Sequence, residues 1–334
     1  MESIRVSELV KIFETRVKAA GFLGSLRGLV RPEKRLVHAV RSISFGMDPG
    51  ELVGFIGPNG AGKSTTIKIL TGILHPSGGM ANVLGFVPWV DRRKLAYRIG
   101  TVFGQRPQLW YHLPALDTFY LFGKIYEQDD AAVKQRIAFL AEAFEIGHLL
   151  ETPVRKLSLG QRMRCEVAAS LIHRPSLLLL DEPSIGLDVV AKQRIRDTIR
   201  HLNEVEGVGV LLTSHDAGDI EALCKRVIII NHGKIIYQDR VSALKRNYLT
   251  TKQVDVRYAG EVPSNFALDG VETLKVGRYG AKLRFDVRET PVEQVIAELA
   301  GKGSLLDVTI SDPSLEEVIR TIYQADGSQE TDTG

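Results

Sequence analysis

The chain has 334 residues, of which 44% are hydrophobic and 25% charged, as is typical of a soluble globular protein with one large core, or one core and a smaller second domain. The net charge is +3, but residues 18–35 carry five basic side chains and one acidic one. The positive charge is thus concentrated in one segment, which argues against a positive electrostatic potential over the whole protein that would attract nucleic acid. No stretch approaches the roughly 20 apolar residues that span a bilayer, and the N-terminus lacks a signal-peptide pattern. We therefore expect a cytosolic chain that is not itself a channel.

The first unusual element in chain order is KAAGFLGSLRGLVRPEKR, at residues 18–35. Its apolar side chains recur at helical spacing with basic ones beside them, while its glycines would leave an isolated helix marginal. We therefore expect this insertion, at about residues 16–37, to be ordered only against another surface. Anionic lipid or a membrane partner is the favoured surface, and an intramolecular apolar cover and nucleic acid are the alternatives.

Residues 1–245 alternate short β-branched runs with longer amphipathic segments, the pattern of an α/β domain with a largely parallel sheet. Most of residues 115–173 is predicted to be helical, and strands are predicted at 51–57, 98–104, 176–182, 209–214 and 226–231. From 251 to 324 the pattern changes to a small α+β accessory module without a chemical motif. The polar residues 325–334 are predicted to be a disordered tail.

The segment GFIGPNGAGKSTT, at residues 54–66, contains the full pattern G-x-x-x-x-G-K-[ST] between an apolar strand and a helix-like run. The glycines let backbone amides turn toward phosphate oxygens, and the helix N-terminus favours the anion. Lys63 can reach the β- and γ-phosphates, and Ser64 can place its hydroxyl on Mg²⁺. The residues predicted to bind nucleotide here are Gly57, Pro58, Asn59, Gly60, Ala61, Gly62, Lys63, Ser64 and Thr65.

A second half of such a site follows at SLLLLDEP, a buried-strand run that ends in Asp181 and Glu182. A carboxylate at the carboxyl end of a strand beside the P-loop strand suits Mg²⁺, so Asp181 is predicted to be a metal ligand. Glu182 is placed to orient or deprotonate an attacking water. The two segments together predict Mg²⁺-dependent hydrolysis of a nucleoside triphosphate.

Just before that strand, LSLGQ at residues 157–161 resembles the signature motif of ATP-binding cassette (ABC) proteins. Further features of the family stand in the family's order: an aromatic residue for adenine, a Q-loop, a D-loop and a switch histidine, at Phe13, Gln105, Asp188 and His215. The resemblance covers roughly residues 3–245. It implies an α/β P-loop NTPase cassette with a RecA-like core, an antiparallel β subdomain and a helical subdomain at about 107–173.

The resemblance also implies an ATP site divided between two subunits that pair head to tail around two ATP molecules. Gln105 would contact Mg²⁺ or water, and His215 would contact the γ-phosphate and orient the attacking water. Leu159 departs from the glycine that is commoner in the family. The residues that would contact ATP on the other subunit are Ser158, Gly160, Gln161 and Asp188.

The C-terminal module and its PSLEEVI ending resemble those of cassettes that serve two-gene exporters of the ABC-2 type. The segments GFVPW, GQRPQLWYHLPALDT and LSLGQRMRCE resemble a bacterial subgroup, some of whose members are associated with viologen export. Such a subunit needs separate permease subunits and is held by them at the cytoplasmic face of the membrane. Within residues 107–126, we predict that Trp110, Tyr111 and Leu113 lie near the groove that receives a permease helix.

Two other functions remain as alternatives. A soluble ABC ATPase that acts on nucleic acid or ribosomes has only the basic segment 18–35 in its favour, because the sequence contains neither a second cassette nor a long coiled coil. A non-hydrolysing regulatory subunit is disfavoured because every hydrolytic position is intact. We therefore expect ATP and Mg²⁺ as ligands and no nucleic-acid partner, with export favoured over import.

Overall fold

The computed structural model describes residues 2–16, 34–104, 106–248, 251–263 and 266–331. The chain divides into two compact units, residues 1–238 and 239–334. The division precedes helix α9 (Val241–Tyr248), whereas the sequence predicts it after residue 245. Most of the predicted insertion, residues 17–33, lies outside the described residues, as does Gln105.

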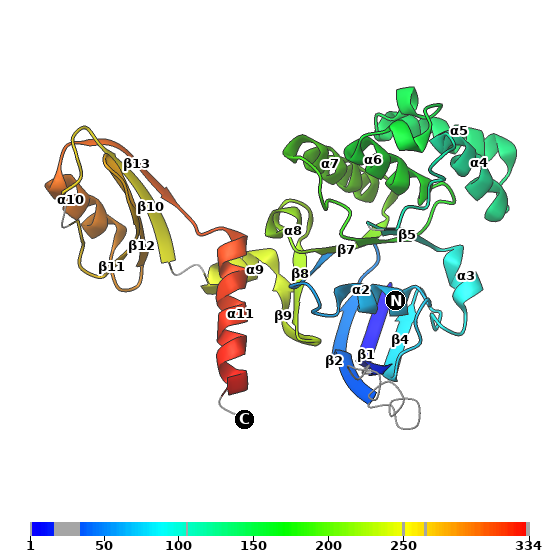
Figure 1. The fold of residues 1–334 in the computed structure, drawn as a ribbon, viewed down its shortest axis with the longest axis horizontal. Coiled ribbons are helices and arrows are strands. Elements are labelled where there is room, and N and C mark those ends of the chain that lie inside the picture. The colour runs from blue at the N-terminus through cyan, green and yellow to red at the C-terminus, as the bar shows by residue number, and fades with distance from the viewer. Residues whose placement is uncertain (1, 17–33, 105, 249–250, 264–265, 332–334) are drawn as a thin grey trace, which may run out of the picture. The chain divides into compact units, whose positions relative to one another are not determined.

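A six-stranded sheet in the order β5-β6-β7-β3-β8-β9 forms the centre of the first unit (Figure 1). Its strands are β3 (Leu52–Ile56), β5 (Ile99–Phe103), β6 (Leu177–Asp181), β7 (Gly209–Ser214), β8 (Arg226–Asn231) and β9 (Lys234–Arg240). The pairs from β5 through β8 are parallel. Strands β3 and β7 are buried along their whole length, as expected for a parallel sheet with both faces covered. The five strands predicted in this region are found within one residue of their expected ends.

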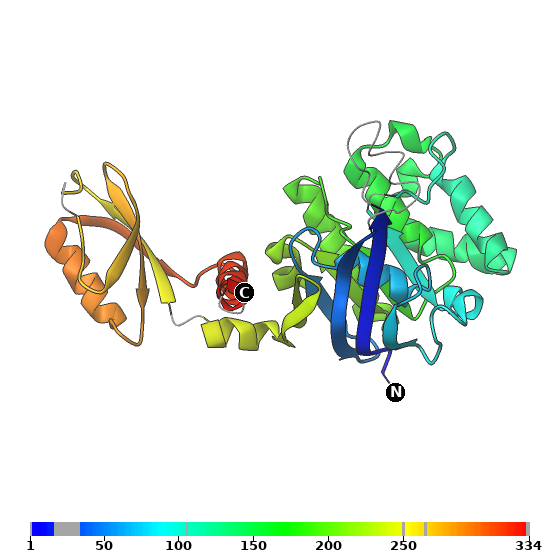
Figure 2. The same ribbon diagram turned by 60° about the horizontal axis from the view of Figure 1, so that its bottom comes forward.

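Helix α2 (Lys63–Leu70) packs between this sheet and a three-stranded antiparallel sheet in the order β2-β1-β4 (Figures 1 and 2). The strands of the second sheet are β1 (Ile4–Arg16), β2 (Lys34–Met47) and β4 (Gly78–Val83). A single apolar cluster runs through all three layers and includes Ile43, Ile67 and Val53. This shared core holds the N-terminus of α2 in place.

The opposite face of the parallel sheet carries α6 (Leu159–Ala169), α7 (Val189–Glu206) and α8 (Ala217–Leu223) (Figure 1). The helical region also contains α4 (Ala115–Ile125), α5 (Asp130–Ala143) and the short 3₁₀ turns η1 (Gly147–Leu149) and η2 (Val154–Lys156), and α3 (Arg92–Ala96) precedes β5. Among the described residues, no helix combines the length and the apolar character needed to cross a membrane.

The second unit is an antiparallel sheet in the order β11-β12-β10-β13, with α10 (Val292–Lys302) packed on one face through Val295 and Leu299. Its strands are β10 (Thr251–Tyr258), β11 (Val271–Val276), β12 (Gly280–Asp286) and β13 (Leu305–Ser311). Helix α11 (Leu315–Thr331) ends the described chain. Residues 325–331 are thus helical where the sequence predicts a disordered tail, because extending an existing helix costs far less than starting one.

Candidate active site

Two glycines shape the loop between β3 and α2. A Cβ at Gly57 would lie 2.4 Å from the carbonyl oxygen of Ile230, and one at Gly62 would lie 2.5 Å from that of Ala39. Gly62 also has a φ of +109°, a conformation that side-chain-bearing residues rarely adopt. The loop therefore runs close against β8 and β2 and presents the first turn of α2, whose N–H groups have no intrahelical partner, at the carboxyl end of β3.

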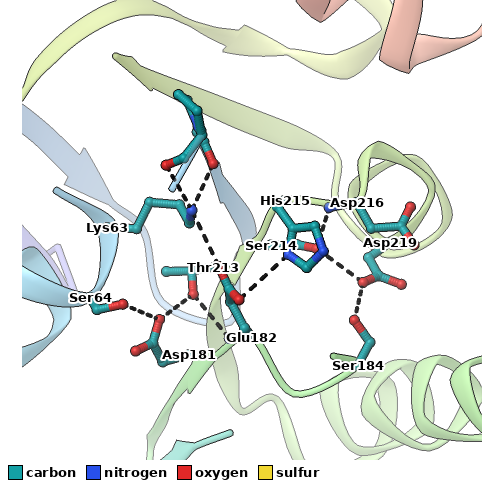
Figure 3. A network of polar contacts seen from close by, with 12 residues as sticks. Lys63, Ser64, Asp181, Glu182, Ser184, Thr213, Ser214, His215, Asp216 and Asp219 are labelled. Carbon is teal, nitrogen blue, oxygen red and sulfur yellow. Dashed lines mark hydrogen bonds and ion pairs between the residues drawn. The ribbon is translucent and has the colours of Figure 1, made fainter. Parts of the chain in front are cut away.

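The Lys63 side chain is buried at the start of α2, with 4% of it exposed. Its ammonium donates to the carbonyl oxygens of Gly57 at 2.6 Å and Pro58 at 3.2 Å, and it pairs with Glu182 Oε1 at 3.3 Å (Figure 3). These contacts occupy the three donors of the ammonium. The positive charge is thus held beneath the loop, and its donors can pass to phosphate oxygens that enter the site.

Asp181 ends β6 beside the first turn of α2. Its Oδ1 accepts hydrogen bonds from Ser64 Oγ at 3.1 Å and from Thr213 Oγ1 at 2.7 Å (Figure 3). The parallel strands β6, β7 and β3 are neighbours, so their carboxyl ends bring these residues to one edge of the sheet. The 3.1 Å between Ser64 Oγ and Asp181 Oδ1 matches two neighbouring ligands of an octahedral Mg²⁺ ion with metal–oxygen distances of about 2.1 Å. The pair therefore fits Mg²⁺.

Glu182 lies between a cation and an imidazole. Its Oε1 faces Lys63, and its Oε2 lies 3.5 Å from His215 Nδ1. The backbone φ of Glu182 is 53°, which for a non-glycine residue costs on the order of 1–3 kcal/mol. Its N–H donates to the Thr213 backbone carbonyl and to Thr213 Oγ1, both at 3.1 Å, and these bonds hold the residue in that conformation. The strained turn directs the carboxylate toward His215.

These side chains line a cavity of about 460 Å³, within the range of about 300–1,000 Å³ that small-molecule sites occupy. The predicted residues in its lining are Asn59, Gly60, Ala61, Gly62, Lys63, Ser64, Thr65, Asp181, Glu182 and His215. Lining residues that the sequence analysis did not name are Lys68, Phe103, Gly104, Arg106 and Ile185. Lys68 and Arg106 add to Lys63, so permanent cations outnumber the carboxylates. This charge balance suits a polyphosphate that carries Mg²⁺.

The residues of the signature-like loop lie outside this cavity. Ser158 caps α6, since its Oγ accepts from the Gln161 N–H at 3.2 Å while Gln161 Oε1 accepts from the Ser158 N–H at 2.9 Å. Asp188 caps α7 by accepting from the Ala191 N–H at 2.8 Å. A Cβ at Gly160 would lie 2.8 Å from the Cβ of Ala191, so the starts of α6 and α7 touch. They form a surface of two adjacent helix N-termini.

Phe13 and Gln105 complete the predicted set. Phe13 lies opposite Val37 in the antiparallel sheet, half-buried, with the Lys11 ammonium 5.0 Å from its ring centre. It is not among the described residues that line the cavity. Gln105 lies outside the described residues, and its neighbours Gly104 and Arg106 line the cavity.

Comparison with known proteins assigns this architecture to a family. The chain matches the ABC transporter family over residues 40–185. It is 34% identical over 226 residues to the ABC transporter ATP-binding protein NatA of Bacillus subtilis, an alignment that covers 68% of this chain and 90% of the relative. The chain belongs to the ATP-binding subunits of ABC transporters. These subunits hydrolyse ATP with Mg²⁺ and work as dimers with membrane permease partners.

Other relatives of this ABC ATPase are named for export or resistance. The linearmycin resistance ATP-binding protein LnrL of Bacillus subtilis is 30% identical over 84% of this chain and 91% of its own length. The fluoroquinolones export ATP-binding protein of Mycobacterium tuberculosis is 36% identical over 74% of this chain and 81% of its own length. The fold resembles a dimeric ATP-binding cassette solved in a post-hydrolysis state with ADP and Pi, with a TM-score of 0.60 and 21% identity over 71% of this chain and 98% of that one.

These findings confirm the predicted fold class, the predicted ATPase activity and the exporter branch of the family, and they favour transport over the nucleic-acid alternative. The narrower resemblance to the viologen-associated subgroup stays a prediction. The ABC ATPase also contains a contact that the sequence analysis missed: Thr213 binds both Asp181 and Glu182. The signal for it was the polar pair Thr213 and Ser214 at the end of an otherwise apolar buried strand.

Proposed function

We propose that this ABC ATPase hydrolyses ATP in the cavity at the carboxyl ends of β3, β6 and β7 and thereby drives export through separate permease subunits. The observation that carries the proposal is the position of Glu182 between Lys63 and His215, beside the Ser64–Asp181 pair (Figure 3). A cation, an acid and an imidazole then act on one γ-phosphoryl group. The relatives named for linearmycin resistance and fluoroquinolone export support the direction of transport.

In the proposed mechanism, Lys63 and the N–H groups of residues 57–65 hold the phosphate oxygens and neutralise the charge that develops on them. Ser64, Asp181 and Gln105 hold Mg²⁺, which when bound supplies further charge neutralisation on the transferred group. Glu182 accepts a hydrogen bond from the attacking water and aligns it, and His215 contacts the γ-phosphate and helps to orient that water. Phe13 lies against the adenine ring.

A second cassette, either another copy or a paralogue, supplies the remaining part of each site. We place Ser158, Gly160, Gln161 and Asp188 of one subunit against the ATP bound by the other, with two ATP molecules enclosed in a head-to-tail pair. The adjacent starts of α6 and α7 support this assignment, since helix N-termini attract anions and these two lie outside their own chain's cavity.

The role of Glu182 is tested by Glu182→Gln, which keeps the shape of the side chain and removes its charge. We expect hydrolysis at saturating ATP to fall by about 10²- to 10³-fold while ATP binding persists. Glu145→Gln is the matched control, because Glu145 also has a left-handed φ, of 50°, and does not line the cavity. A Glu182→Gln chain that hydrolyses ATP at the control's rate would remove Glu182 from the mechanism.

Residues 107–126 are proposed to receive a permease helix. Trp110 and Tyr111 are each 54% exposed and Leu113 is 37% exposed, an apolar cluster that suits a docking surface. The backbone just before Trp110 is hydrogen-bonded to α6. The buried Glu166 of α6 accepts from the N–H groups of Gln108 and Leu109 at 2.9 and 3.4 Å. Burial raises the pKa of Glu166, and these two bonds oppose that shift. A movement of α6 would therefore be transmitted to the docking segment.

Cysteine crosslinking tests this docking. The native Cys165 and Cys224 are buried, so cysteines introduced at positions 110, 111 and 113 can be labelled selectively. They should crosslink to the permease in the assembled transporter, whereas a cysteine at the exposed Val205 on α7 should not. Crosslinking at Val205 alone, or at none of the three predicted positions, would place the permease elsewhere.

We also propose that the subunit lies at the cytoplasmic face of the membrane and that residues 18–35 contact anionic lipid there. Strands β1 and β2 pair up to Arg16 and Lys34, so the two described residues that flank positions 17–33 lie opposite each other at one end of this ladder. Deleting residues 18–35 should keep ATP binding and weaken association with vesicles that contain phosphatidylserine, but not with neutral ones. Equal association before and after the deletion would leave the permease as the sole membrane anchor.

A further inference from the structure

We infer that Asp219 is a positioning residue for ATP hydrolysis, which fixes the loop after Glu182 relative to the strand end that carries His215. The inference rests on the catalytic roles proposed for Glu182 and His215. Asp219 lies in the first turn of α8, is 2% exposed and is not among the described residues that line the cavity. It therefore acts through other residues and not by touching the nucleotide.

One oxygen of Asp219 joins the two catalytic segments. Its Oδ2 accepts hydrogen bonds from Ser184 Oγ and, at 3.1 Å, from Ser214 Oγ (Figure 3). Ser184 follows Glu182 by two residues, and Ser214 immediately precedes His215. Both serines are buried, so water does not readily replace these bonds. A single carboxylate thus links the two segments, in addition to the bonds between Glu182 and Thr213.

The hydrogen-bond network around Asp219 involves the residues on both sides of His215 in the sequence. The Asp216 N–H donates to Ser214 Oγ at 2.9 Å, so the serine hydroxyl accepts from the residue after His215 while it donates to Asp219. The direct contact between His215 Nδ1 and Glu182 Oε2 is 3.5 Å, longer than a strong hydrogen bond. Because that contact is weak, the relative position of the two side chains depends on what supports their backbones.

The other carboxylate oxygen of Asp219 connects these segments to α7, the helix that Asp188 caps. Asp219 Oδ1 accepts from Arg196 Nε at 2.9 Å and from a second guanidinium nitrogen at 2.5 Å. One turn earlier on α7, Lys192 pairs with Asp216 at 2.5 Å. Two charge pairs thus fasten α7 to α8. A buried carboxylate with every bond made to a fixed partner is rigid, which is the property that a positioning residue needs.

A double-mutant cycle between Asp219→Asn and His215→Ala in the full-length chain, with its permease where hydrolysis requires it, tests the inference. The amide cannot accept all four bonds, so we expect the rate at saturating ATP to fall by about tenfold or more, with the Kd for ATP changed by less than about threefold. In the His215→Ala background the same change should lower the rate by less than about twofold. Asp197→Asn, which removes an exposed carboxylate from α7, should leave the rate unchanged.

Equal effects of Asp219→Asn in the two backgrounds would overturn the inference and leave the role of His215 intact. A wild-type rate for His215→Ala alone would instead refute the role proposed for His215, and the inference with it. Ser214→Ala keeps the Asp219–Arg196 pair and serves if Asp219→Asn does not fold. We expect it to lower the rate by about threefold or more, again only where His215 is present, and a wild-type rate for Ser214→Ala would overturn the inference.

Discussion

The phosphate cavity and the touching starts of α6 and α7 are built from similar parts, but their serines bond to different partners. Each places a serine at a helix N-terminus. Ser64 bonds to Asp181, 117 residues away, whereas Ser158 bonds to an amide of its own helix. At the start of α2, long-range pairing brings Asp181 and Glu182 to the turn that carries Lys63 and Ser64. The second N-terminus is suited to complete a site on another subunit.

The largest effect should come from the charge at the centre of the cavity. Lys63→Ala removes the buried ammonium that pairs with Glu182 and lines the cavity. We therefore expect hydrolysis to fall by at least about 10³-fold and ATP binding to weaken. The measurement is phosphate release and equilibrium ATP binding. Lys68→Ala, which removes another lining cation, should cost much less. Similar losses from the two changes would mean that bulk positive charge, and not the placement of Lys63, drives binding.

Changes at the start of α6 should lower hydrolysis less than Lys63→Ala does, and without weakening ATP binding. Ser158→Ala should lower hydrolysis by about 10- to 100-fold while ATP binding by the isolated chain is unchanged, because Ser158 is expected to contact the other subunit's nucleotide. The cap itself contributes about 1 kcal/mol to stability. Asp129→Ala removes the matching cap of α5, where Asp129 accepts from two amides, and should keep hydrolysis.

Mixing subunits sharpens this prediction. A pair of one Lys63→Ala subunit and one Ser158→Ala subunit contains one intact composite site in a head-to-tail arrangement, so a mixture of the two variants should regain activity that neither shows alone. A mixture no more active than its components would argue against a shared site.

A substitution beside the cavity that leaves every charge in place should have a moderate effect on the rate of hydrolysis. Thr213→Val removes the hydroxyl that bonds to Asp181 and Glu182 while preserving shape, and should slow hydrolysis by about tenfold. Thr198→Val is the control, since that hydroxyl bonds only within α7, to the Arg194 carbonyl. Equal rates for Thr213→Val and the control would show that the Thr213 hydroxyl is not needed to hold Asp181 and Glu182.

The smallest effect on hydrolysis at neutral pH concerns His173, which is buried away from both regions. Burial lowers its pKa from 6.5 to about 4, and the ring stacks on Tyr126. Above pH 6.5 the ring is neutral whether the chain is folded or unfolded, so its protonation does not change the stability there. As pH falls from 6.5 toward 4 the unfolded chain takes up the proton first, and the free energy of unfolding should drop by up to about 3 kcal/mol. Urea unfolding of His173→Leu should show a flatter pH dependence over that range, and an unchanged slope would contradict it.

Much of the cassette followed from local pattern. Buried parallel strands are continuous apolar runs, which is why β3, β6 and β7 were predicted with nearly correct ends and why Asp181 and Glu182 stood out after one of them. The strands β11 and β13 were not predicted, because their side chains are mostly half-buried or exposed and alternate irregularly. The sequence predicts the boundary after residue 245, where its pattern changes, whereas the two compact units divide between residues 238 and 239.

By itself the sequence determined the chemistry available to this protein: a glycine-rich loop with Lys63, two acids after a strand, a histidine after another, and a signature-like helix start. The tertiary structure decided which of these meet. It brought Lys63, Asp181, Glu182 and His215 to one cavity, left Ser158 and Asp188 outside it, and revealed Thr213 and Asp219 as the residues that hold the acids and the histidine in register. The reason is geometric: residues at the ends of parallel strands far apart in sequence become neighbours only when the strands pair side by side.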